Sequence, residues 1–175
     1  AYSKGAVFLA QLGYVIGQES LSKTLREYYR EFKFKHPRPN DFRRVAERVS
    51  GIQLKWYLTD WTQTTNKIDY ALEEVIESGA STLIKIKRNE LMPMPLEILV
   101  LSKNGKRELH YIPISLMRGE KLNPYDINWT VHKDWSWSSL NYSLKINTPK
   151  DQIQAIIIDP SNLMADIDKS NNYYD

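Results

Sequence analysis

The sequence predicts an α+β protein in which a helical array is followed by a β-sandwich, and three observations support this class. Apolar residues recur at helical spacing through residues 1–63. From residue 68 onward they alternate with polar residues, which is the period of strands. Turn signals separate these alternating segments, and the absence of crossover helices between them disfavours a parallel sheet. We therefore expect two domains, residues 1–66 and residues 67–175.

The composition is that of an ordinary folded chain and excludes several classes of protein. The 175 residues are 42% hydrophobic and 26% charged, without a disorder signature. They contain no apolar run of about 18 residues, so we expect no membrane span. The chain contains 0 cysteines, which excludes disulfides and thiolate metal sites.

Charge is distributed unevenly along the chain. Residues 1–67 carry 12 basic and 6 acidic residues, a net +6, and the total of +3 leaves −3 for the remainder. Arg43, Arg44 and Arg48 could form a basic helical face for phosphates. A solvated surface or a docking face for another domain is the favoured interpretation, so we expect no nucleic-acid partner.

The first helix, residues 1–17, is apolar around most of its circumference, so it is expected to have neighbours on more than one side. It begins without a capping residue or a run-in. We expect the chain to be the C-terminal piece of a larger protein, cut inside a domain. A domain that simply begins with a helix is the alternative.

Three more helices follow, joined by short loops. The second covers residues 20–32, with Ser20 or Ser22 as its cap. Asn40 and Asp41 cap the third, which Ser50-Gly51 ends, and the fourth covers residues 53–63. The buried stripe of the second helix is predicted to be Leu21, Leu25, Tyr28, Tyr29 and Phe32.

Seven short strands predict an immunoglobulin-like β-sandwich. Asn104-Gly105 predicts a hairpin with a two-residue type I′ turn between the third and fourth strands. The polar segment Asp168–Asp175 is expected to be a frayed tail. The predicted strands are Asp69–Glu77, Thr82–Arg88, Leu96–Ser102, Arg107–Leu116, Trp129–Val131, Tyr142–Ile146 and Gln152–Ile158.

No self-contained active site is evident in the residue pattern. His36, His110 and His132 are scattered over a loop and two strands, so no metal site is predicted. Neither a nucleophile motif nor a glycine-rich phosphate loop is present. Asp166–Asn172 has the alternating oxygen residues of a calcium loop, but Asn171 replaces the required glycine, which favours an exposed polar tail.

Three tryptophans leave two roles open for the second domain. Trp129, Trp135 and Trp137 could line a ligand groove. Trp135 and Trp137 share a face at a spacing of two, and packing inside the domain is the favoured role.

An ordered set of motifs resembles the aminopeptidase N–type zinc metallopeptidases, the gluzincins that include leukotriene-A hydrolase. Tyr2-Ser-Lys-Gly5 resembles the Tyr-x-Lys-Gly motif that begins a helix of that family. The segments that continue the resemblance are Ala6–Leu9, Leu12, Ile16-Gly17, Leu25–Tyr29, Phe34–Pro37, Asp41-Phe42, Ser50-Gly51 and Leu54–Trp61. Those that resemble the family's C-terminal sandwich are Ile68–Tyr70, Met92–Pro95, Trp135–Trp137, Ile158–Pro160, Ala165-Asp166 and Asn171-Asn172.

The resemblance implies the end of a thermolysin-like catalytic domain, followed by the sandwich, in a peptide-hydrolysing parent. Tyr2 matches the family tyrosine that stabilises the oxyanion, while Lys4 and Gly5 are structural, Gly5 allowing close helix packing. The parent would hold zinc, but the family's zinc ligands and general-base glutamate lie upstream of this helix, so the chain is expected to be inactive alone.

Peptide substrate and the upstream domains of the same polypeptide are the expected partners, and substrate-binding residues are not identified. Relatives with such a β-domain are often exported, which implies a periplasmic or extracellular parent. A different class of function, a non-catalytic peptide- or protein-interaction module built on exposed aromatic residues of the sandwich, is the alternative.

Overall fold

The chain folds into helices followed by strands, which confirms the α+β prediction. The computed structural model describes residues 2–175; the side chain of Tyr2 lies outside the described part. Two compact units are present, residues 1–66 with 116–124 and residues 67–115 with 125–175. Among the described residues, no helix combines the length and the apolar character needed to cross a bilayer.

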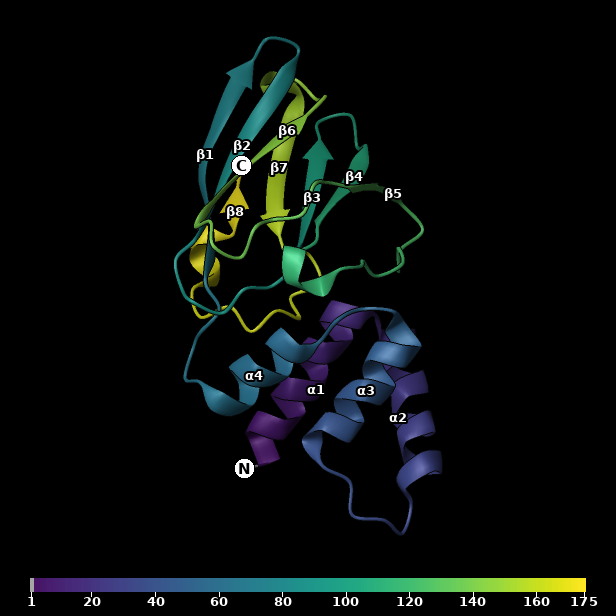
Figure 1. Cartoon of the computed structure of the whole chain (residues 1–175). Coiled ribbons are helices and arrows are strands. Elements are labelled where there is room, and N and C mark those ends of the chain that lie inside the picture. The colour runs from purple at the N-terminus through teal and green to yellow at the C-terminus, as the bar shows by residue number, and fades with distance from the viewer. Residues whose placement is uncertain (1) are drawn as a thin grey trace. The chain divides into compact units, whose positions relative to one another are not determined.

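In the described part of the chain, the first unit contains four helices (Figure 1): α1 (Tyr2–Ile16), α2 (Gln18–Phe32), α3 (Pro39–Ser50) and α4 (Lys55–Gln63). Glycine or proline lies at the junction of α1 with α2 and at both ends of α3. Gly17, with φ 88°, separates α1 from α2. Gly51 adopts the left-handed conformation and donates its N–H to the Glu47 carbonyl, which ends α3 as predicted.

The predicted N-caps of α2 and α3 are wrong. Helix α2 begins at Gln18, directly after Gly17, without a side-chain cap. Helix α3 begins one residue before Asn40, at Pro39, whose missing N–H costs nothing in a first turn. Asp41 serves that helix from inside, because its carboxylate accepts the Arg38 backbone N–H at 2.8 Å.

Burial in the helical unit also differs from the periodicity. In α1, residues 3–7 are exposed and residues 11–16 are buried. In α2, Leu21 and Thr24 are buried, whereas Leu25 and Tyr29 are 41% and 70% exposed. The predicted stripe is therefore wrong at these two positions. Sequence spacing identified the apolar face of α2 but not how much of it other helices cover.

The second unit contains two sheets, with strand orders β1-β2-β6 and β5-β4-β3-β7-β8 (Figure 1). Seven strands lie within a few residues of the predicted ones. Alternation is strict in β2, where every second residue is buried. Leu96, Ile98 and Val100 of β3 have no exposed surface. The strands are β1 (Tyr70–Ser78), β2 (Ser81–Arg88), β3 (Leu96–Ser102), β4 (Arg107–Ile112), β5 (Asn128–Val131), β6 (Asn141–Ile146), β7 (Ile153–Ile158) and β8 (Tyr173–Tyr174).

The hairpin between β3 and β4 forms as predicted, but its turn type is different. Gly105 donates its N–H to the Ser102 carbonyl at 2.8 Å, and Ser102 donates to Lys106 at 2.9 Å. Gly105 has a positive φ of 84° and Asn104 does not. A type I′ turn needs positive φ at both residues, so this is a longer loop that ends on a left-handed glycine.

Two other strand predictions are corrected. Strand β4 ends at Ile112, because Pro113 cannot donate to the ladder, and β5 then pairs with β4 in parallel. The C-terminal segment is ordered and not frayed, since Lys169–Asn171 forms a 3-10 turn and β8 pairs with β7. Neither feature was predictable from apolar periodicity, because the connection from β4 to β5 contains no α-helix and β8 has only two residues.

Candidate functional site

The Tyr2–Gly5 motif occupies the first turn of helix α1. The catalytic role expected of Tyr2 falls on a side chain outside the described residues. Lys4 is exposed, and a methyl group added to Gly5 would meet no heavy atom within 4 Å in the described part. The predicted role of Gly5 in close packing is thus wrong for the helices of this chain.

The face of α1 that carries Gly5 borders an apolar groove of about 450 Å³ in the helical unit. All four helices contribute to its lining, which includes Gly5, Phe8, Leu9, Leu25, Phe42 and Leu58. The exposed Leu25 lies here, so the groove accounts for part of the apolar surface that the other helices leave uncovered.

Aromatic packing fixes α1 against α4. The ring of Phe8 lies 5.1 Å from Tyr57 and 6.2 Å from Trp61, measured between ring centroids. The Tyr57 hydroxyl donates to the Phe8 carbonyl at 2.6 Å. Burial raises the pKa of Tyr57, so this hydroxyl keeps its proton and remains a donor. The helix that begins with Tyr2 is therefore held by both packing and a directed hydrogen bond.

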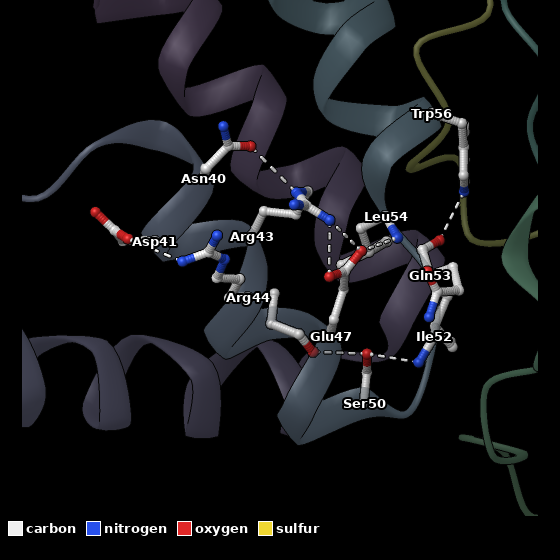
Figure 2. A network of polar contacts seen from close by, with 11 residues as sticks. Asn40, Asp41, Arg43, Arg44, Glu47, Ser50, Ile52, Gln53, Leu54 and Trp56 are labelled. Carbon is white, nitrogen blue, oxygen red and sulfur yellow. Dashed lines mark hydrogen bonds and ion pairs between the residues drawn. The ribbon is translucent and has the colours of Figure 1, made fainter.

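An ion pair organises the turn from α3 to α4 (Figure 2). Arg43 donates through Nη1 to both carboxylate oxygens of Glu47 at 2.9 Å, and the two side chains are only 19% and 17% exposed. Glu47 also accepts the backbone N–H of Leu54, the residue before α4, at 2.7 Å. The Glu47 carboxylate thus pairs with the Arg43 guanidinium and also accepts a backbone N–H that has no partner within helix α4.

Replacing Glu47 by Ala is expected to lower the free energy of unfolding by about 2–3 kcal/mol. The change removes the carboxylate that pairs with the largely buried guanidinium of Arg43 and accepts the backbone N–H of Leu54. Chemical denaturation followed by circular dichroism measures this. The control is Glu27→Ala, which removes the exposed pair with Arg30 and should cost about 0–1 kcal/mol. Equal losses in the two variants would show that the Glu47 network has no special role.

A buried lysine attaches residues 116–124 to the helices of their unit. Lys121, which is 5% exposed, donates to the Tyr14 carbonyl at 2.6 Å and lies 4.4 Å from the centre of the Tyr14 ring. The predicted second domain, residues 67–175, includes this segment, whereas the structure groups it with the helices. The charge is accommodated because a carbonyl and an aromatic face both compensate its loss of water.

Two of the three histidines come together in space. His110 Nδ1 and His132 Nε2 are 2.9 Å apart, and His110 is 6% exposed. His36 is an exposed loop residue of the other unit. Within the described part of the chain, no three side chains of His, Cys, Asp or Glu form a group that could hold a metal ion. Residue spacing gave no sign of this pair.

The calcium-like segment uses its carboxylates on the chain itself. Asp166 accepts the N–H groups of Tyr70 and Asp168, at 3.0 and 2.9 Å. Asp168 accepts the N–H of Ser170 at 3.1 Å. Burial raises the pKa of Asp166, although these hydrogen bonds oppose the rise. The segment is a set of side-chain-capped turns that anchors the C-terminal strand.

The three tryptophans of interest do not form one surface. Trp135 is 3% exposed and packs on Tyr70, whereas Trp137 is 57% exposed, so the two do not share a face as predicted. Trp129 stacks on Tyr111 with ring centroids 4.9 Å apart. Two of the three rings therefore pack within their unit.

Comparisons with known proteins point to aminopeptidases. No protein-family model matches the chain. It is 33% identical over 75 residues to the glutamyl aminopeptidase of Sus scrofa, a match that covers 43% of this chain and 8% of that protein. The crystal structure of Legionella pneumophila aminopeptidase A in complex with aspartic acid has a similar fold, with a TM-score of 0.62 and 12% identity.

That likeness covers 94% of this chain and 17% of the Legionella chain, so the chain spans a small share of both relatives. The sequence match is to an aminopeptidase, and the fold match shows that the architecture of this chain also occurs in one. The chain is thus similar to part of an aminopeptidase of the aminopeptidase N type, which confirms the resemblance predicted from its ordered motifs.

Proposed function

We propose that this chain is the C-terminal segment of a zinc-dependent, aminopeptidase-like metalloprotease that hydrolyses peptide bonds. The Tyr2–Gly5 motif at the start of α1, together with the similarity to two aminopeptidases, carries the proposal. Residues 1–66, with the segment 116–124 that packs on them, would end the catalytic domain, and the rest of residues 67–175 would form an immunoglobulin-like sandwich domain. The substrate would be a peptide bound by the parent protein.

In this proposal Tyr2 stabilises the negative charge that develops on the oxygen of the scissile carbonyl. A phenol O–H is a neutral donor that gains most when the oxygen becomes an oxyanion, so it favours the transition state over the substrate. Such a donor must be held in place before the reaction. The contacts of Phe8 and Tyr57 immobilise α1 two turns after Tyr2, which suits that requirement.

The metal of such a peptidase would be held by residues outside this chain. The described side chains offer no group of metal ligands, so they do not fit a zinc ion, and no step at the metal is assigned to them. Bound zinc supplies a Lewis acid and an activated water in metallopeptidases. These 175 residues would accordingly be inactive without the rest of the polypeptide.

Paired assays of the 175-residue chain and the full-length protein test the proposal. Metal analysis is expected to find zinc in the full-length protein only. Cleavage of aminoacyl substrates is expected there as well, and a chelator should abolish it. If the full-length protein neither holds zinc nor cleaves peptides, the peptidase proposal is wrong.

A further inference from the structure

Strand β5 is a short edge strand that depends on one neighbour. It has four residues and pairs with β4 alone, in parallel register from Asn128 to Val131. Its hydrogen bonding continues past Val131, where the His132 backbone N–H donates to the Tyr111 carbonyl and that of Trp135 donates to the Pro113 carbonyl, both at 2.8 Å. Directly at this end the imidazoles of His110 on β4 and His132 meet. The histidine pair is therefore a side-chain link beside the end of a strand that is paired on one side only.

The two rings meet head to head. Their centroids are 5.1 Å apart and the facing nitrogens are 2.9 Å apart. The difference, 5.1 − 2.9 = 2.2 Å, is close to twice the distance from the centre of an imidazole to its nitrogen, so the contact is nearly linear. Linear geometry suits an N–H···N hydrogen bond, whereas a metal held by both nitrogens would require them to point to a third position.

Burial assigns the proton of this hydrogen bond. His110 Nε2 is buried and has no hydrogen-bond partner in the part of the chain that the structure describes. A proton there would be an orphaned donor, which is costlier than an unpaired acceptor. His110 thus carries its proton on Nδ1 and donates to His132 Nε2.

We propose that His110 and His132 form an acid-sensitive latch, which holds β5 on β4 while both rings are neutral and releases it when the pair takes up a proton. Two neutral rings offer one donor and one acceptor at the contact. A proton added to His132 puts two N–H groups face to face unless His110 moves its own proton to Nε2. A proton added to His110 goes to Nε2 directly. Either route creates a buried donor without an acceptor.

The charged groups around the pair do not remove this cost. Burial is the main cause that lowers the pKa of His110 to about 4, and the neighbouring His132 is the second. Lys106 also lowers this pKa, whereas Glu108 raises it. Burial likewise lowers the pKa of His132. The Glu108 carboxylate is engaged by Lys106 at 2.9 Å and Thr148 at 3.0 Å. On the other side of the contact, the residues that follow His132 are the exposed Lys133 and Asp134.

The sign and range of the pH effect follow from these values. The native pKa of His110 lies below the ordinary 6.5, so the stability of the latch is complete above pH 6.5 and is lost as the pH falls toward about 4. Each pH unit in this range changes the equilibrium constant for opening of the latch about tenfold. At pH 5, which is 1.5 units below 6.5, opening of the latch should be favoured about 30-fold over its value at neutral pH.

Hydrogen exchange of the full chain at pH 7.5 and pH 5 tests the latch, with rates corrected for the intrinsic effect of pH. Amides of residues 128–132 should lose about 30-fold of their protection at pH 5, while those of β2 in the same unit change less than about threefold. His110→Gln, whose amide can still donate to His132, should reduce the loss to less than about threefold. His36→Gln, at the exposed third histidine, should behave as the unchanged chain does.

An NMR titration of the His110 ring in the unchanged chain gives a second measurement, independent of whether His110→Gln folds. The midpoint of ring protonation should lie well below pH 6.5, at the pH where the loss of protection ends. The latch is overturned if protection at residues 128–132 is independent of pH, if β2 loses protection equally, or if the His110 ring of the native chain titrates at its ordinary pKa of 6.5. These outcomes do not depend on peptidase activity, so they leave the proposed function untouched.

Discussion

Replacing Tyr2 by Phe in the full-length protein is expected to reduce kcat by about 100- to 1,000-fold and to leave the zinc content unchanged. The change removes one hydroxyl and keeps the ring. An oxyanion donor acts in the transition state and contributes little to substrate binding, so KM should change far less than kcat. Steady-state kinetics with an aminoacyl substrate, together with metal analysis, measure both effects.

Tyr29→Phe is the matched control, because it makes the same chemical change on a tyrosine that is 70% exposed on α2. It should retain the activity of the unchanged protein. Activity at that level in Tyr2→Phe as well would remove the catalytic assignment. A proportional loss of zinc in Tyr2→Phe would instead indicate a structural role near the metal.

The elements of this fold were predictable because the chain changes its apolar period once, near Asn66. The predictions are wrong where proline, glycine or the packing of neighbouring elements overrides the periodic pattern. Pro39 displaced the helix start expected at Asn40, and Gly105 alone took the positive φ that a type I′ turn would have shared with Asn104. Leu25 has the spacing of a core residue but is 41% exposed. Periodicity identifies the apolar face of a helix but does not show whether other helices pack over it.

The candidate site was less predictable than the fold. The catalytic role proposed for Tyr2 rests on a motif alone, because periodicity and composition assign it no chemistry. The histidine pair is not predictable from the sequence, because its members are 22 residues apart and meet through a parallel pair of strands without a connecting helix. The role of Glu47 is equally absent from the sequence pattern. Nothing in the spacing of α3 indicates that this carboxylate accepts the backbone N–H of Leu54.

Replacing Tyr57 by Ala is expected to lower the free energy of unfolding of the helical unit by about 3–5 kcal/mol, the largest stability effect anticipated in this chain. Tyr57 is 1% exposed, and its ring contacts Phe8, Trp56 and Trp61. Truncation would leave a cavity between α1 and α4 that the surrounding rings cannot fill. Denaturant unfolding followed by far-ultraviolet circular dichroism reports on the helices directly.

Tyr57→Phe separates the two contributions of this side chain. It keeps the ring and removes the hydroxyl that donates to the Phe8 carbonyl at 2.6 Å, so it should cost about 0.5–1.5 kcal/mol. Tyr29→Ala, on the exposed face of α2, should cost less than about 0.5 kcal/mol. If Tyr57→Phe proved as damaging as Tyr57→Ala, the hydrogen bond and not the aromatic packing would hold α1 in place. Because α1 begins with Tyr2, the answer also decides which interaction would position the proposed oxyanion donor.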